Sequence, residues 1–154
     1  MHSRTVSTLA ALYLDASALV KLVQVEAESA ALQAYLAGHP TDRRVTSLLS
    51  RTEVVRAVWS GGPPAQQQAL IVLEQTEQVA LNRAVLDHAG MLMPGVRLRT
   101  LDAIHLASAL ALGSELQALI CYDMRLSQAA AVVGLVPIAP VHLAAGLEPA
   151  DSHS

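Results

Sequence analysis

A chain of 154 residues is long enough to bury a sizeable core in one domain, and its 53% hydrophobic residues supply that core although Phe is absent. Only 3% of the residues are aromatic, which argues against a module that stacks RNA bases or sugar rings on aromatic platforms. The formal net charge of −3 also argues against simple electrostatic binding of nucleic acid, unless several acids surround a metal ion that neutralises them.

The first quarter of the chain predicts two strands and a helix between them. Residues 11–14 form an apolar run that ends at Asp15, as in a buried central strand. Residues 17–37 follow a helical pattern that stops at Gly38. Residues 45–47 are a weaker strand candidate.

The middle of the chain predicts two more helices separated by a breaker. Residues 50–53 read Ser-Arg-Thr-Glu, which matches a capping box and predicts a helix running toward Trp59. The glycines and prolines of residues 61–64 are expected to break it, and residues 65–74 predict the next helix.

The second half alternates between strands and helices. The predicted strands are residues 79–81, 119–122 and 136–138, and the predicted helices are residues 83–92, capped by Asn82, residues 100–112 and residues 125–133. Such alternation predicts an α/β fold with a central, mostly parallel sheet and helices on both faces. We expect one domain over residues 1–141 and a flexible tail over residues 142–154.

Four acids fall at comparable places in this pattern. Asp15 and Asp123 directly follow the two most apolar strands, and Glu53 and Asp102 lie in the first turns of predicted helices. Ligands of parallel sheets gather at the carboxyl ends of the strands, so we expect these acids to converge there. Neighbouring carboxylates need a cation to remain ionised, and Mg²⁺ or Mn²⁺ suits ligands that are all oxygen.

Each of these acids also has a purely structural explanation, and the sequence leaves both readings open. Glu53 could complete the capping box with Ser50, and Asp102 could complement the dipole of its helix. Asp15 and Asp123 could initiate turns or cap the helices that follow them.

Four segments, in the same order as the acids, resemble the motifs of PIN-domain toxins of the VapC type. They are YLDASALVK at 13–21, SRTEVVRA at 50–57, LRTLDAIHLA at 98–107 and YDMRL at 122–126, the last followed by Ala129, Ala130 and Gly134. The third is the most distinctive, and the match extends over about residues 11–138.

This resemblance implies a PIN-like fold and a metal-dependent endoribonuclease that requires Mg²⁺ or Mn²⁺. It implies the toxin component of a type II toxin–antitoxin system, which inhibits growth by cleaving cellular RNA and pairs with a VapB-type antitoxin. Residue by residue, it carries over Asp15, Glu53, Asp102 and Asp123 as the catalytic acids. Asp15, Asp102 and Asp123 would be metal ligands, and Glu53 would act directly or through water.

The same resemblance assigns Ser17 as the hydroxyl that supports the first Asp. Some relatives carry a further acid shortly after the fourth, and this chain has none there, so a stable second metal is not expected. Which carboxylate serves as the general base stays open.

Three further residues are candidates for the surroundings of the site. His105, three residues after Asp102, could support the site or simply pack within its helix. Arg56, three residues after Glu53, could orient that acid, contact RNA or form an ordinary ion pair. Arg99 could hold RNA or lie in a solvated loop.

Two other functions compete with the toxin. A PIN-type nuclease that processes RNA outside toxin–antitoxin systems would carry the same acids. A metal-dependent adhesion module also begins with strand-Asp-x-Ser, but it needs another Ser two residues after Ser17, where Leu19 stands.

The location of the protein is inferred from cysteine and apolar patterns. Cys121 is the single cysteine, so the chain can form neither an intrachain disulfide nor a multi-cysteine zinc site. Residues 6–14 followed by Ala-Ser-Ala resemble a secretion signal, but Asp15 interrupts the pattern. No apolar run approaches the roughly 20 residues that span a membrane. We expect a cytoplasmic protein and, from exposed apolar helix faces, a homodimer.

Overall fold

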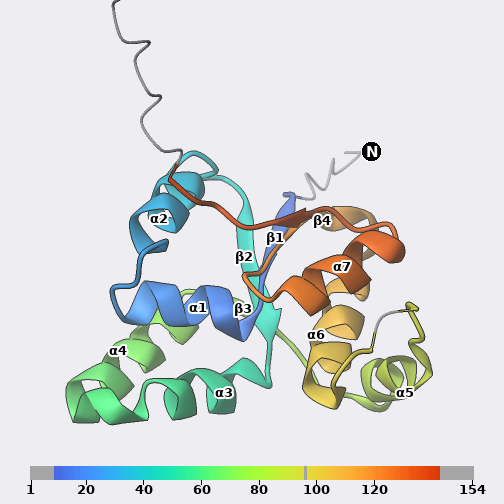
Figure 1. Cartoon of the computed structure of the whole chain (residues 1–154), viewed down its shortest axis with the longest axis horizontal. Helices are drawn as coiled ribbons and strands as arrows, with labels where there is room; N and C mark the ends of the chain where they lie inside the picture. Colours follow the sequence, from blue (N-terminus) through green and yellow to red (C-terminus); the bar gives the residue numbers. More distant parts are fainter. Residues whose placement is uncertain (1–8, 96, 143–154) are drawn as a thin grey trace, which may run out of the picture.

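The structure, a computed structural model, describes residues 9–95 and 97–142 (Figure 1). Its centre is a 5-stranded sheet in the order β3-β2-β1-β4-β5, in which every pairing is parallel. The strands are β1 (Ala11–Leu14), β2 (Arg43–Ser47), β3 (Glu77–Val79), β4 (Leu116–Ile120) and β5 (Pro137–Ile138). The predicted α/β fold with a parallel sheet is confirmed. The predicted tail falls on residues that, apart from His142, lie outside the described ones.

Helices cover both faces of this sheet, as Figure 1 shows. One side carries α1 (Ala16–Val23), α2 (Ser29–Ala37), α3 (Ser50–Ala57) and α4 (Gly62–Glu74), and the other carries α5 (Arg83–Met91), α6 (Thr100–Leu110) and α7 (Met124–Val132). Short 3-10 turns at Trp59–Gly61 and Gly113–Glu115 complete the elements. Among the described residues, no helix has both the length and the apolar character that crossing a membrane requires.

The central strand β1 supplies side chains to two cores, because successive residues of a strand point to opposite faces. Leu12 and Leu14 pack into the core beneath α1, α2, α3 and α4, whereas Ala11 and Tyr13 pack into the core beneath α6 and α7. All of these side chains are fully buried. The apolar character of β1 therefore follows from its central position between two covered faces.

The prediction of a single helix over residues 17–37 is wrong. The first helix ends at Val23 and the next begins at Ser29. Ser29 Oγ accepts a hydrogen bond from the backbone N–H of Glu26 at 2.9 Å and donates one to the carbonyl of Gln24 at 3.2 Å. A serine that bonds to nearby backbone in this way offers the chain an alternative to continuing the helix.

The predicted capping box at Ser50 is also wrong. The residue that precedes α3 is Leu49, which makes no side-chain cap. Ser50 Oγ instead lies 2.7 Å from Thr46 Oγ1, at the end of β2. Glu53 does not reach back to the start of its helix but bonds to His105 on α6. A residue of the preceding strand and a residue of a distant helix have therefore replaced the local pair.

Other boundaries differ by a few residues. The prediction that Asn82 caps α5 is confirmed, since its Oδ1 accepts from the N–H of Val85 at 2.9 Å. The third strand lies two residues earlier than predicted, and the fourth ends at Ile120 rather than at Tyr122. The prolines expected to break a helix lie in the first turn of α4, where a missing N–H costs nothing.

At the amino ends of the strands, one arginine joins three parts of the sheet. Arg43 Nε lies 2.8 Å from Glu77 on β3, and Arg43 Nη1 lies 2.8 Å from Glu115, just before β4. A cation of the chain itself therefore offsets part of the acidic charge at this edge.

Candidate active site

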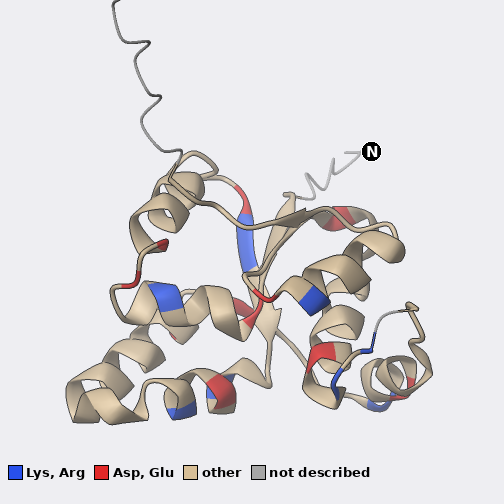
Figure 2. Cartoon of the chain, in the orientation of Figure 1, with Lys and Arg blue, Asp and Glu red and all other residues tan. Residues whose placement is uncertain are grey.

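The four predicted acids lie around the carboxyl ends of the central strands. Asp15 follows β1 and caps α1, and Asp123 follows β4 and caps α7. These two strands are paired, with Leu14 beside Ile120. Glu53 and Asp102 lie in the first turns of α3 and α6. Figure 2 shows acidic positions from several elements around the lower ends of these strands.

Asp15 is the most deeply placed of the four, with 4% of its surface exposed. Its Oδ1 accepts hydrogen bonds from Ser17 Oγ at 2.7 Å and from the N–H of Ala18 at 3.0 Å. Its Oδ2 accepts only the weak thiol donor of Cys121, at 3.2 Å. Burial raises the pKa of Asp15, although His105 and these hydrogen bonds oppose the shift. The buried carboxylate would be stabilised by a further positive partner.

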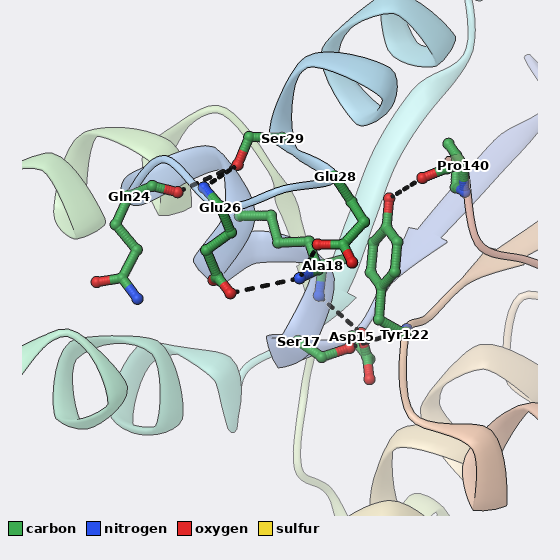
Figure 3. A network of polar contacts seen from close by, with 10 residues as sticks. Asp15, Ser17, Ala18, Gln24, Glu26, Glu28, Ser29, Tyr122 and Pro140 are labelled. Carbon is green, nitrogen blue, oxygen red and sulfur yellow. Dashed lines mark hydrogen bonds and ion pairs between the residues drawn. The ribbon is translucent and has the colours of Figure 1, made fainter. Parts of the chain in front are cut away.

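Asp15 belongs to a polar network that joins α1 to the end of β4 (Figure 3). Besides donating to Asp15, Ser17 Oγ accepts from the N–H of Tyr122 at 3.1 Å. Lys21 Nζ lies 4.7 Å from the centroid of the Tyr122 ring and 2.8 Å from Glu28. The supporting position predicted for Ser17 agrees with these contacts, and Ser17 additionally links two neighbouring elements.

Asp102 and Asp123 share one cationic side chain. Arg99 Nε lies 3.4 Å from Asp102 Oδ2, and Arg99 Nη2 lies 3.5 Å from Asp123 Oδ2. The pKa of Asp102 is raised by burial and then by the charge of Asp123, while Arg99 offsets part of this shift. Even so, Asp102 Oδ2 is buried and accepts no hydrogen bond within the described structure. Buried oxygens normally accept a hydrogen bond, whereas this atom has only its ion pair with Arg99.

Asp15 and Asp123 use their two oxygens in the same way. Asp123 Oδ1 accepts from the N–H groups of Arg125 and Leu126 at 2.9 and 3.0 Å, as Asp15 Oδ1 accepts from Ala18. In both residues Oδ1 caps a helix, and Oδ2 has no backbone N–H as partner. The structural and functional explanations are therefore compatible, because they involve different oxygens.

Glu53 is connected to the core through His105. Glu53 Oε1 lies 2.6 Å from His105 Nε2, and His105 Nδ1 lies 2.8 Å from the hydroxyl of Tyr13. The sequence pattern does not single out Tyr13 as a neighbour of the site. Its signal is a hydroxyl inside an aliphatic strand, since a buried tyrosine needs a hydrogen-bond partner.

Arg56 lies apart from these contacts. It is exposed on α3 and lines a surface pocket with Trp59. No ion pair between Arg56 and Glu53 forms among the described residues.

These acids fit a divalent cation by their chemistry, but they are not gathered as a finished ligand cluster. Within residues 9–95 and 97–142, no group of three or more His, Cys, Asp or Glu side chains is close enough to hold one ion. The site does offer oxygen ligands, including Oδ2 of Asp102, which accepts no hydrogen bond. Arg99 pairs with both Asp102 and Asp123, two of the acids that would hold a cation. A metal ion would therefore replace a guanidinium.

Comparisons with known proteins agree with this architecture. The PIN domain family matches residues 12–132. Ribonuclease VapC46 of Mycobacterium tuberculosis is 47% identical over 133 residues, covering 86% of this chain and 99% of that protein. Ribonuclease VapC35 of the same species is 39% identical, with coverages of 84% and 96%.

Solved structures share the fold. The crystal structure of M. tuberculosis VapC20, described as a toxin that cleaves the sarcin–ricin loop, superposes with a TM-score of 0.68 at 18% identity. The superposition covers 84% of this chain and 100% of VapC20. VapBC2 of Rickettsia felis, bound to a promoter DNA fragment, gives a TM-score of 0.62 at 14% identity, with coverages of 84% and 98%. Fold, extent of match and identity to named relatives agree, and the chain belongs to the PIN-domain family, among its VapC ribonucleases.

Proposed function

We propose that this chain is a divalent-metal-dependent endoribonuclease and the toxin of a type II toxin–antitoxin pair, which inhibits growth by cleaving cellular RNA. The observation that carries the proposal is the arrangement of Asp102 and Asp123 about a single cationic group, with one buried carboxylate oxygen left without a hydrogen bond. Membership of the VapC ribonucleases supports the reaction, because these relatives carry that activity in their names.

In this proposal Asp15, Asp102 and Asp123 hold Mg²⁺ or Mn²⁺ through the oxygens that do not cap helices. A divalent cation at this position would stabilise the negative charge that develops on the scissile phosphate. Glu53 acts at the same site through water, and it can accept the proton of the attacking water. Ser17 keeps Asp15 in place through its 2.7 Å hydrogen bond.

Arginines would supply contacts to the RNA backbone. The Arg99 side chain is 69% exposed, so it can leave Asp102 and Asp123 and turn toward a phosphate when a metal ion binds. Guanidinium groups match phosphate oxygens in pairs. Arg56, exposed on the same helix as Glu53, would contact a more distant part of the RNA.

A VapB-type antitoxin is the proposed protein partner, supported by the fold shared with the VapBC2 complex. Met91, the last residue of α5, and Met93, just after it, are 80% and 90% exposed and support a homodimer that covers them. Light scattering of the purified chain would test the dimer. The enzyme would act in the cytoplasm, where its RNA substrates are made.

Cleavage of total RNA by the purified chain tests the activity. We expect cleavage with Mg²⁺ or Mn²⁺, none in EDTA, and recovery when metal is restored. Full activity in EDTA would contradict the metal-dependent mechanism, and no activity with any divalent metal would contradict the nuclease.

A further inference from the structure

His105 is a buried histidine whose two ring nitrogens both have partners on other elements. It is 2% exposed and lies on α6. Its Nε2 contacts Glu53 on α3 at 2.6 Å, and its Nδ1 contacts the fully buried Tyr13 on β1 at 2.8 Å. The Tyr13 and His105 rings meet edge-on, with interplanar angle 75°. A histidine that merely fills space has no need of two such bonds across three elements.

The partners determine which nitrogen carries the proton. The Glu53 carboxylate can only accept, so Nε2 must donate to it. A neutral imidazole has one N–H, which leaves Nδ1 as an acceptor. In the neutral form of the ring, the Tyr13 hydroxyl therefore donates to Nδ1. The direction of donation runs from Tyr13 through His105 to Glu53.

This arrangement acts on the acid that is proposed to work through water. Glu53 and Asp102 line one pocket of about 280 Å³. The bond from His105 holds Glu53 Oε1 and leaves Oε2 as the oxygen available to water or a cation. One helix, α6, thus carries the acid Asp102 and, one turn later, the support of a second acid on α3.

We propose that His105 is a positioning residue which, oriented by Tyr13, holds Glu53 in place for the hydrated cation and the attacking water. The proposal rests on the metal-dependent nuclease function above. Residues that hydrogen-bond to the ligands of a metal ion fix the orientation of those ligands. The loss of such a residue typically costs about 10- to 100-fold in metal affinity or activity. His105 does not touch the RNA or the cation in this scheme.

The first test is spectroscopic and needs no activity. A long-range ¹H–¹⁵N spectrum of the metal-free chain should show protonated Nε2 and unprotonated Nδ1 at His105, assigned by its absence in His105→Gln. Tyr13→Phe should remove this single tautomer and give a mixture. Protonation at Nδ1 in the wild type would overturn the proposed direction.

The second test compares variants with and without a donor. His105→Gln keeps an N–H that can reach Glu53, whereas His105→Leu keeps bulk and removes the donor. We expect His105→Leu to lower kcat by about 10- to 100-fold with KM for RNA little changed. The same variant should need a higher Mn²⁺ concentration to reach half of the maximal increase in melting temperature. His105→Gln should recover most of both. The exposed His88, changed to Gln, is the matched control.

The outcomes separate this inference from the function it rests on. Equal losses in the Gln and Leu variants would mean that His105 only packs, which overturns the inference while leaving the nuclease intact. If the wild type neither cuts RNA nor responds to Mn²⁺, the proposed function fails instead. If His105→Leu does not fold, Tyr13→Phe decides: a lowered kcat with a native circular-dichroism spectrum supports the positioning role, and wild-type kcat refutes it.

Discussion

At the scale of single residues, Asp102 carries the clearest electrostatic cost in the site. Its Oδ2 is buried without a hydrogen bond, and burial together with Asp123 raises its pKa above the ordinary value of 3.8. A carboxylate in this position costs folding energy when it is ionised, unless a cation compensates. That cost is useful where a metal ion must be bound firmly.

Changing Asp102 to Asn should therefore separate stability from activity. We expect cleavage to fall by orders of magnitude, because a metal ligand is lost, while the metal-free variant is as stable as the wild type or more stable. The raised pKa means that the folded wild type loses stability as the pH rises from 3.8 through the folded-state pKa. The stability difference between Asp102→Asn and the wild type should thus be absent below pH 3.8 and complete above the folded-state pKa of Asp102.

Thermal or urea unfolding in EDTA across this pH range measures the difference, beside a cleavage assay with Mn²⁺. Asp87→Asn, which removes an exposed acid from α5, is the control and should behave like wild type in both. An Asp102→Asn protein that cuts RNA at nearly the wild-type rate would remove Asp102 from the site.

Arg99 should compete with the metal, since it lies 3.4 and 3.5 Å from the carboxylates of Asp102 and Asp123. We expect Arg99→Gln to lower the Mn²⁺ concentration needed for half-maximal thermal stabilisation, while KM for RNA increases. Arg97→Gln removes the same charge from the same loop and should leave the Mn²⁺ midpoint nearly unchanged. Equal shifts in the two variants would indicate only a general charge effect.

At the scale of elements, the predictions that held were those set by burial and by the parallel sheet. The apolar run before Asp15 is β1, and the acids lie at strand ends because parallel strands end at one edge. Local signals were less reliable: the capping box of Ser50 and Glu53 lost both members to Thr46 and His105. His105 is distant in sequence from Glu53, and Thr46 lies in the strand before Ser50, so the capping-box pattern alone reveals neither partner.

The same limit applies to the network around α1. Nothing in the spacing of Lys21 and Tyr122 indicates that they stack, because α1 and the end of β4 become neighbours only through the sheet order. The break after Val23, by contrast, involves a local contact, the hydrogen bond from Ser29 to the carbonyl of Gln24. The position of the acids at the carboxyl ends of the strands could be predicted from the sequence, but most of the contacts around them could not.

Ser17 offers a test at this scale, because its hydroxyl bonds to Asp15 on one side and to the backbone of Tyr122 on the other. We expect Ser17→Ala to lower the free energy of unfolding by about 1 kcal/mol per bond lost and to reduce cleavage partially. Ser114→Ala, at an exposed position, is the control. Activity unchanged in Ser17→Ala would mean that the remaining partners suffice to hold Asp15.

At the scale of the whole molecule, the net charge of −3 no longer argues against RNA binding once the acids are divided by location. Asp15, Glu53, Asp102 and Asp123 belong to one edge, where a cation would neutralise part of their charge. Figure 2 shows basic positions beside them, on the loop that precedes α6 and on α7. The surface met by RNA would therefore be less acidic than the composition suggests.

Expression of the intact protein tests the toxin proposal. We expect expression alone to arrest growth, co-expression of the cognate antitoxin to restore it, and the Asp102→Asn chain to be harmless at equal abundance. Growth curves with immunoblots measure this. If unchecked expression is harmless although the purified protein cuts RNA well, an RNA-processing nuclease becomes the better interpretation.

The two edges of the sheet differ in where their positive charge comes from, and this has a consequence for local opening. Arg43 ties Glu77 and Glu115 together at 2.8 Å on each side without a metal ion. In the proposed function, the opposite edge would depend on a metal ion that the buffer can supply or withdraw. A chelator should therefore accelerate amide hydrogen exchange near the ends of β1 and β4 and leave the starts of β2 and β3 protected. Removal of the metal would therefore increase local opening at the carboxyl ends of the strands and not at their amino ends.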